Sequence, residues 1–158
     1  MKKIIILVVA LCLSQGALAN AKLAKALDSF HHAAAEADLE RYFGLLSENA
    51  VFLGTDAEER WTKAEFKQYV EPYFSQGRGW LYRVTERNIS MDKEGEMAFF
   101  DELLTNENYG KCRGSGVLVK TDNGWKIAQY NLSIPVPNAI AKEVVNKISE
   151  FEQKPNAL

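Results

Sequence analysis

Cysteine is scarce in this chain of 158 residues, which has only Cys12 and Cys112. Cys12 lies in a hydrophobic N-terminal segment that we expect to be removed, which leaves Cys112 alone. A lone cysteine cannot form an intramolecular disulfide, so packing must stabilise the domain without a covalent crosslink. No histidine pattern accompanies Cys112, and we interpret it as a small packed strand residue rather than a nucleophile.

Several motifs of binding and catalysis are absent from the sequence. It has no glycine-rich phosphate loop, no nucleophile elbow and no zinc signature. His31 and His32 are adjacent on a predicted helix and point about 100° apart, so we interpret them as surface or packing residues rather than as ligands of one metal ion. We therefore predict no cofactor and no metal site.

Long hydrophobic runs are also rare, and the one clear run lies at the N-terminus. Lys2 and Lys3 precede ten apolar residues, Ile4–Leu13, and Ala17-Leu18-Ala19 supplies small residues for a signal peptidase. A transmembrane anchor is the alternative, but a span needs roughly 20 apolar residues. We predict that residues 1–19 are a cleaved signal peptide. This predicts a bacterial periplasmic or secreted protein that has no membrane association after cleavage.

The charge balance shows no excess of one sign that would suit nucleic acid. The chain has 19 basic and 21 acidic side chains. The predicted signal peptide holds two of the lysines, so the remaining domain has a net charge of −4. There is no basic stripe and no basic run with interleaved aromatic residues. We predict a mildly acidic soluble domain that does not bind nucleic acid.

Hydrophobic periodicity divides the rest of the chain into helices followed by strands. Helical spacing predicts helices over residues 21–37, 39–46 and 138–153, and a fourth helix follows the capping box Thr62-Lys63-Ala64-Glu65. Period-two patterns and turn signals predict strands over residues 50–53, 80–91, 97–105, 111–120 and 125–134. This order indicates an α+β fold with a strongly curved antiparallel sheet wrapped around N-terminal helices. Such a sheet leaves a cavity at one end, where ligands commonly bind.

Five sequence segments resemble one known group of domains. They are residues 52–56 (FLGTD), 59–61 (ERW), 98–102 (AFFDE), 113–119 (RGSGVLV) and 124–133 (GWKIAQYNLS). Together they resemble the SnoaL-like branch of the nuclear transport factor 2-like, or cystatin-like, superfamily, and the resemblance covers about residues 21–138. It implies a cone-shaped domain over residues 20–137 that often forms homodimers through its sheet. Residues 138–158 would then be a C-terminal amphipathic helix and tail.

This resemblance does not identify a reaction. Members of the superfamily include polyketide cyclases, ketosteroid isomerases, dehydratases and domains without catalysis, so the fold alone does not define an activity. Our first hypothesis is a pocket for a small, largely apolar molecule. The alternatives are a cofactor-free isomerase, cyclase or dehydratase, and a dimeric interaction module that offers its terminal helix to a partner.

Strand alternation suggests which side chains line the pocket. In the last strand Trp125, Ile127, Gln129 and Asn131 share one face, which we expect to point inward. Both faces of strand 97–105 carry a carboxylate, and the resemblance favours Asp101 as the inward one. Arg113 opens the neighbouring strand and could pair with Asp101. The predicted pocket residues are Trp61, Tyr73, Phe99, Asp101, Arg113, Gln129 and Asn131.

Two roles compete for Asp101. As a general acid or base it would move a proton while Gln129, Asn131 or Tyr73 stabilised an enolate-like oxygen. As half of a buried ion pair with Arg113 it would only hold the strand register. An arginine partner lowers the pKa of a carboxyl group and weakens it as a base, which favours the structural role.

Overall fold

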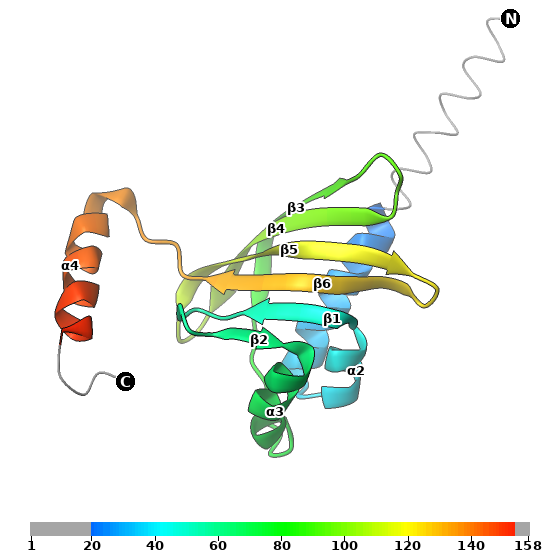
Figure 1. The fold of residues 1–158 in the computed structure, drawn as a ribbon, viewed down its shortest axis with the longest axis horizontal. Coiled ribbons are helices and arrows are strands. Elements are labelled where there is room, and N and C mark those ends of the chain that lie inside the picture. Colours follow the sequence, from blue (N-terminus) through cyan, green and yellow to red (C-terminus); the bar gives the residue numbers. More distant parts are fainter. Residues whose placement is uncertain (1–19, 154–158) are drawn as a thin grey trace, which may run out of the picture.

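The computed structural model describes residues 20–153 and has an α+β architecture, as predicted (Figure 1). Within the described residues the first helix covers residues 20–35. The elements that follow are α2 (Leu39–Gly44), β1 (Leu46–Leu53), β2 (Arg60–Thr62), α3 (Lys63–Phe74), β3 (Arg83–Met91), β4 (Met97–Asn106), β5 (Gly110–Thr121), β6 (Gly124–Ser133), the 3-10 helix η1 (Asn138–Ile140) and α4 (Ala141–Glu152). The predicted signal peptide, residues 1–19, lies outside the described residues.

Six strands form one curled sheet in the order β2-β1-β6-β5-β4-β3. Strands β3 to β6 are the predicted antiparallel meander. Strand β1 pairs in parallel with β6, and the three-residue strand β2, which the sequence did not predict, pairs with β1. The first helix, α2 and α3 lie on the concave side of this sheet (Figure 1).

The core between helices and sheet is rich in aromatic rings. The first helix buries Leu23, Leu27 and Phe30 at helical spacing. Phe30 stacks on Tyr42 at 4.4 Å between ring centroids, and Phe52 of β1 stacks on Phe66 of α3 at 3.8 Å. Burial of each such ring contributes on the order of 1.5–3 kcal/mol, so these contacts hold the helices against the sheet.

The start of α3 confirms the predicted capping box. The Glu65 backbone N–H donates to the Thr62 hydroxyl oxygen, and the Glu65 carboxylate accepts from the Thr62 backbone N–H at 2.8 Å. These hydrogen bonds lower the pKa of Glu65, because they favour its charged form. The cap fixes where α3 leaves β2, and α3 forms one wall of the cavity described below.

Strand β4 corrects the prediction for its two faces. Ala98, Phe100, Glu102 and Leu104 are buried, whereas Phe99 and Asp101 are exposed. The inward carboxylate is therefore Glu102, and the prediction that Asp101 points inward is wrong. The two faces of β4 carry equal numbers of apolar residues, so which carboxylate is buried depends on the side chains that each one can pair with. Glu102 finds an arginine and a histidine on neighbouring elements, which make its burial stable.

A β-bulge in β6 explains why the predicted inward face of this strand is wrong. Val117 pairs with Gln129, but the next residue, Leu118, pairs with Ile127, so Ala128 has no partner on β5. The extra residue interrupts the alternation of faces. Ile127 and then Tyr130 and Leu132 are buried, whereas Gln129 is exposed. The prediction that Gln129 and Asn131 share the inward face with Ile127 is therefore wrong.

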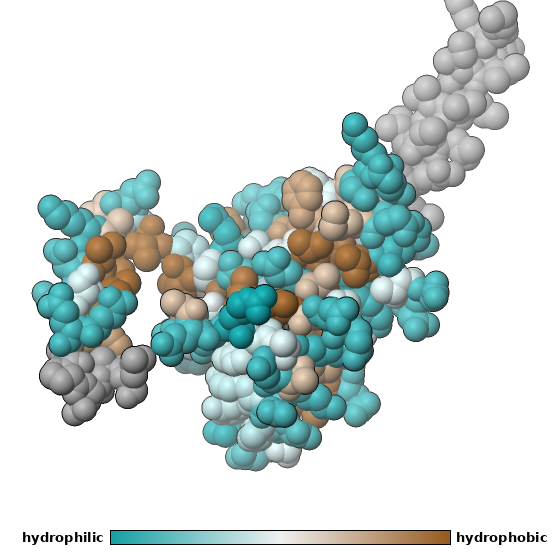
Figure 2. Space-filling model, in the orientation of Figure 1, coloured by the Kyte–Doolittle hydropathy of each residue, from teal (hydrophilic) through white to brown (hydrophobic). Residues whose placement is uncertain are grey.

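Helix α4 projects away from the rest of the domain (Figure 1). It follows the segment Ile134-Pro135-Val136-Pro137 and buries none of its residues. Its apolar side chains Val145, Ile148 and Phe151 are half or more exposed. Figure 2 shows one hydrophobic area on this helix and a separate one over the sheet. Among residues 20–153, no helix is long and apolar enough to cross a membrane.

Candidate functional site

A cavity of about 370 Å³ lies between the concave face of the sheet and the helices. This volume is within the range of small-molecule sites. All six tyrosines of the chain line it, together with two of the three tryptophans. The aromatic lining residues are Phe30, His31, Tyr42, Phe52, Trp61, Phe66, Tyr69, Tyr73, Trp80, Tyr82, Tyr109 and Tyr130.

The outer part of the cavity has flat aromatic walls. Trp61 of β2 stacks on Tyr69 of α3 with ring centroids 5.0 Å apart, and Tyr69 lies 5.6 Å from Tyr73 one turn later. The guanidinium group of Arg78 lies over the Tyr73 ring at 5.1 Å. Tyr69 and Tyr73 remain partly exposed, so this row of rings reaches from the interior to the mouth.

The inner tyrosines are protonated across the neutral pH range. Burial raises the pKa of Tyr42 and of Tyr130 well above the ordinary value, and the negative charge of Glu102 raises that of Tyr130 further. Burial also raises the pKa of Tyr82. A phenol that keeps its proton is a hydrogen-bond donor, so the inner cavity combines apolar rings with hydroxyl groups.

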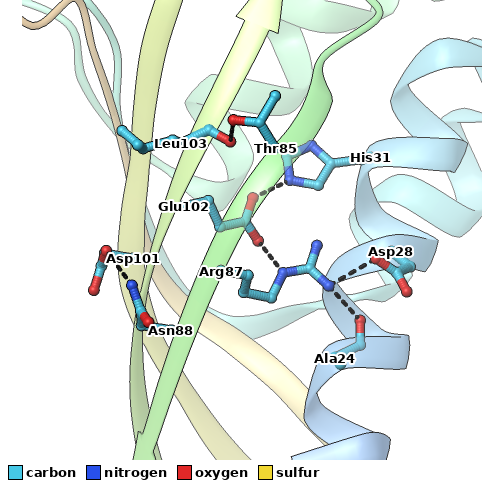
Figure 3. Close-up of polar contacts among 9 residues, drawn as sticks. All are labelled: Ala24, Asp28, His31, Thr85, Arg87, Asn88, Asp101, Glu102 and Leu103. Carbon is cyan, nitrogen blue, oxygen red and sulfur yellow. Dashed lines mark hydrogen bonds and ion pairs between the residues drawn. The ribbon is translucent and has the colours of Figure 1, made fainter.

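A buried polar network lies beside the cavity (Figure 3). Nε2 of His31, on the first helix, is 2.6 Å from Oε2 of Glu102 on β4, and the Glu102 side chain is fully buried. Nε of Arg87, on β3, donates to the other carboxylate oxygen at 2.9 Å. Nη1 of Arg87 also donates to the Ala24 carbonyl at 3.2 Å and to Asp28 at 2.7 Å. The network therefore ties the first helix to the sheet.

The network also fixes how His31 holds its protons. A carboxylate paired with an arginine only accepts hydrogen bonds, so His31 must donate to Glu102 through Nε2. When the ring is neutral, Nδ1 then carries the lone pair. Nδ1 has no hydrogen-bond partner among residues 20–153, and His31 is part of the cavity wall. The His31 ring is therefore part of the cavity wall and has a buried carboxylate behind it.

The structure brings together only two of the predicted pocket residues. Trp61 and Tyr73 line the cavity. The other five belong to the outer face of the sheet: Phe99, Asp101, Arg113 and Gln129 are exposed, and Asn131 is half-buried. Within the described residues Asp101 forms no ion pair with Arg113, and its carboxylate accepts from Asn88 Nδ2 at 3.3 Å. The proposed Asp101–Arg113 pair is therefore wrong.

The residues that the sequence reading missed are His31, Glu102 and Arg87. His31 lies four residues after Leu27 and one after Phe30, which places it beside the buried stripe of its helix. This spacing was the available signal, since a histidine on an apolar stripe needs a buried partner. His32 is exposed and pairs with Glu36 at 2.9 Å, as a surface residue does. Arg87 and Glu102 face each other across β3 and β4.

Metal ligands do not gather at this site. Within residues 20–153, no group of three histidine, cysteine, aspartate or glutamate side chains is arranged to hold a metal ion. Cys112 is free and fully buried in β5, and its burial raises the pKa of the thiol. The reactive thiolate form is therefore disfavoured, which agrees with its interpretation as a packing residue.

Comparison with protein families finds one match over most of the domain. Residues 23–137 match the family described as the SnoaL-like domain. No curated protein matches the chain.

Solved structures share the fold at low sequence identity. A proposed scytalone dehydratase of Novosphingobium aromaticivorans aligns with a TM-score of 0.67 and 12% identity, over 78% of this chain and 89% of the other. A protein of the NTF2-like group from Pseudomonas putida, of unknown function, aligns with a TM-score of 0.65 and 11% identity over 77% and 90%. A proposed NTF2-like dehydratase of Streptomyces avermitilis aligns with a TM-score of 0.63 and 13% identity over 73% and 95%. At these identities the similarity shows the fold alone.

Proposed function

Because this chain belongs to the SnoaL-like domain family, within the NTF2-like superfamily, we propose that its cavity binds a small, planar and largely apolar molecule. The observation that carries the proposal is the gathering of all six tyrosines around one cavity of about 370 Å³. Tyrosine and tryptophan offer wide apolar contact together with a polar group that orients a ligand.

The composition of the wall defines the ligand further. Aromatic rings prefer to stack on flat groups with an offset or to meet them edge to face, so the row Trp61, Tyr69 and Tyr73 suits a ring system. Aromatic rings outnumber the polar side chains other than tyrosine, which are His31, Thr55, Glu59, Arg78, Asn106 and Asn108. A ligand with one or two oxygen atoms on an apolar frame matches this lining better than a sugar or a nucleotide does.

Binding can be tested with 2-naphthol, an uncharged bicyclic phenol, by isothermal titration calorimetry of the full chain. Leu132→Trp adds bulk inside the cavity, and Gln129→Trp adds the same side chain to the outer face of the same strand. We expect at least a tenfold loss of affinity in Leu132→Trp and less than a twofold change in Gln129→Trp. Equal affinity in both variants, or no binding to the unmodified chain, would contradict the proposal.

We also propose that the domain works outside the cytoplasm after cleavage of residues 1–19. The support is the order of charged, apolar and small residues at the N-terminus. N-terminal sequencing of the protein recovered from a bacterial periplasmic extract should begin at Asn20. Recovery of the uncleaved chain from the cytoplasm would contradict this part of the proposal.

The outer face of the sheet supports a homodimer as a second candidate property. Phe99 and Met97 of β4 are 62% and 48% exposed, and they pair across the strands with Val117 and Val119 of β5. These four side chains form one apolar patch, which a second copy of this chain would cover. Light scattering should find a dimer that Phe99→Arg converts to a monomer, whereas Leu81→Arg, at an exposed position outside the patch, should not. A monomer in the unmodified protein would contradict it.

A further inference from the structure

One charged side chain of the cavity wall has no partner of opposite charge. Arg78 lines the cavity, and among residues 20–153 the ion pairs of arginine belong to Arg41 and Arg87. We propose that Arg78 binds a carboxylate group of the ligand, so that the cavity selects a planar aromatic carboxylate over an uncharged analogue. This inference rests on the proposed ligand-binding function and names the chemical class of its ligand.

The end of α3 places Arg78 beside the aromatic row. Gly77 has a φ of +69°, and its N–H donates to the Phe74 carbonyl at 2.9 Å. The Arg78 N–H donates to the Tyr73 carbonyl at 3.0 Å, and the two bonds together form a Schellman motif. In this motif the residue after the glycine often packs an apolar side chain against the last turn of the helix. Here the Arg78 guanidinium takes that place over the Tyr73 ring, 5.1 Å from its centroid.

The chain that follows Arg78 is fixed against the first helix. The Trp80 N–H donates to the Ala34 carbonyl at 3.1 Å. Gly79 approaches the same carbonyl so closely that a Cβ atom would lie 2.2 Å from its oxygen. Arg78 therefore lies between two anchored points of the backbone, which reduces the ordering that ligand binding would require.

The guanidinium of Arg78 keeps its hydrogen-bond donors for a ligand. Within residues 20–153 the side-chain hydrogen bonds of arginine belong to Arg41 and Arg87, so no described residue accepts from the Arg78 side chain. The planar fork of an arginine matches the two oxygens of a carboxylate, and such bonds are stronger than those between neutral groups. Tyr73 belongs to the aromatic row, so a ring that stacks there brings a carboxylate next to the guanidinium.

The other charges of the wall favour a ligand with a single negative charge. Among the described lining residues there is no lysine and no second arginine, and the one carboxylate is Glu59. Its Oε2 already accepts from the Asp56 backbone N–H at 3.1 Å. A second negative charge on the ligand would find no second cation and would be repelled by Glu59. A carboxylate therefore suits the cavity better than a phosphate monoester does.

The test compares two ligands that share one ring system and one shape. 2-Naphthoate carries a carboxylate that is ionised at neutral pH, and 2-naphthamide is its uncharged analogue. Isothermal titration calorimetry of the full chain should find that 2-naphthoate binds about tenfold more tightly than 2-naphthamide. Equal affinities, or tighter binding of the amide, would overturn the inference.

The variant Arg78→Gln identifies the side chain responsible. It should lower the affinity for 2-naphthoate about tenfold and so remove the preference for 2-naphthoate over 2-naphthamide. Arg113→Gln is the matched control, because it removes the same charge from the exposed outer face of β5. Charges beyond about 10 Å are largely screened, so this control should keep the preference.

Two results with these variants would overturn the inference. Loss of the preference in both would mean that the net charge of the domain, and not Arg78, attracts the ligand. An equal loss of affinity for both ligands in Arg78→Gln would leave the preference intact and show that Arg78 acts only on the structure of the wall.

The outcomes also separate this inference from the binding proposal. If 2-naphthol binds in the cavity but 2-naphthoate binds no more tightly than 2-naphthamide, the inference about Arg78 fails and the binding function stands. If none of the three compounds binds, both fail. Leu132→Trp should weaken the binding of 2-naphthoate as it does that of 2-naphthol; an unchanged affinity for 2-naphthoate would mean that its site lies outside the cavity and would overturn the inference alone.

Discussion

Replacement of Glu102 tests how much the paired charges of the buried network contribute to the stability of the fold. Glu102 is fully buried, and the side chain of Arg87 is only 13% exposed. Glu102→Ala removes the acceptor for both Arg87 Nε and His31 Nε2. Arg87 would keep Asp28, which is 66% exposed, and the Ala24 carbonyl as its remaining partners. The substitution therefore leaves a positive charge in a largely buried position.

The expected cost of Glu102→Ala is about 3–5 kcal/mol of unfolding free energy, because removal of one partner from a buried ion pair leaves the other uncompensated. A domain of this size is stable by roughly 5–15 kcal/mol, so the loss is a large fraction of the total. Urea denaturation followed by circular dichroism measures it. Asp101→Ala, the adjacent carboxylate on the exposed face, is the matched control and should cost no more than about 0.5 kcal/mol.

A double variant distinguishes charge from packing. Glu102→Leu combined with Arg87→Met replaces the pair by apolar side chains of similar size and should recover most of the stability that Glu102→Ala loses. A cost below about 1 kcal/mol for Glu102→Ala would refute the reasoning, since it would mean that water reaches the site. An equal cost for Asp101→Ala would refute the assignment of the two faces of β4.

Three further predictions follow from other parts of the molecule. Deletion of residues 138–158 should leave the unfolding free energy within about 0.5 kcal/mol of the full chain, because α4 buries no side chain; a denaturation curve shifted to much lower urea would contradict it. Gly116→Ala should destabilise the domain by about 1–3 kcal/mol, because a Cβ atom at this position would lie 2.0 Å from the Gln129 carbonyl oxygen next to the bulge. Gly95→Ala is the control: Gly95 lies in an open turn, so this substitution measures only the cost of a positive φ. The free energy of unfolding should fall as the pH rises above about 10, the ordinary pKa of tyrosine. The pKa values of Tyr42, Tyr82 and Tyr130 are raised in the folded state, so above that pH the folded state binds more protons than the unfolded state. Ultraviolet titration and urea denaturation at pH 9 and 11 test this prediction, and equal stability at the two pH values would contradict it.

The fold could be predicted from sequence because its signals are local. The capping box at Thr62, the hairpin turn before Gly124 and the periodicity of the meander strands each depend on neighbouring residues, and all three appear in the structure. The parallel pairing of β1 with β6 and the short β2 are contacts between distant segments, for which a single sequence carries no local pattern. Of the lining residues that were predicted, Trp61 belongs to the segment 59–61 that carries the family resemblance, and Tyr73 lies on the helix that follows the capping box.

The remaining site residues were missed for two physical reasons. On β4 both faces alternate an aromatic residue with a carboxylate, so only the distant partners Arg87 and His31 decide that Glu102 points inward. On β6 a single unpaired residue, Ala128, separates an alternation that holds up to Ile127 from a shifted one that begins at Tyr130. Strand periodicity cannot reveal a bulge in advance, because the bulge depends on the pairing partner.

The position of the tryptophans allows intrinsic fluorescence to report on ligand binding in the cavity. Trp61 and Trp80 are part of the lining, whereas Trp125 lies on β6 outside it. A molecule that enters the cavity and quenches indole emission should therefore reduce the signal of two tryptophans and leave that of the third unchanged. Ligands can then be screened on the unlabelled protein, and Trp125→Phe would remove the constant background without a change in the wall that the ligand contacts.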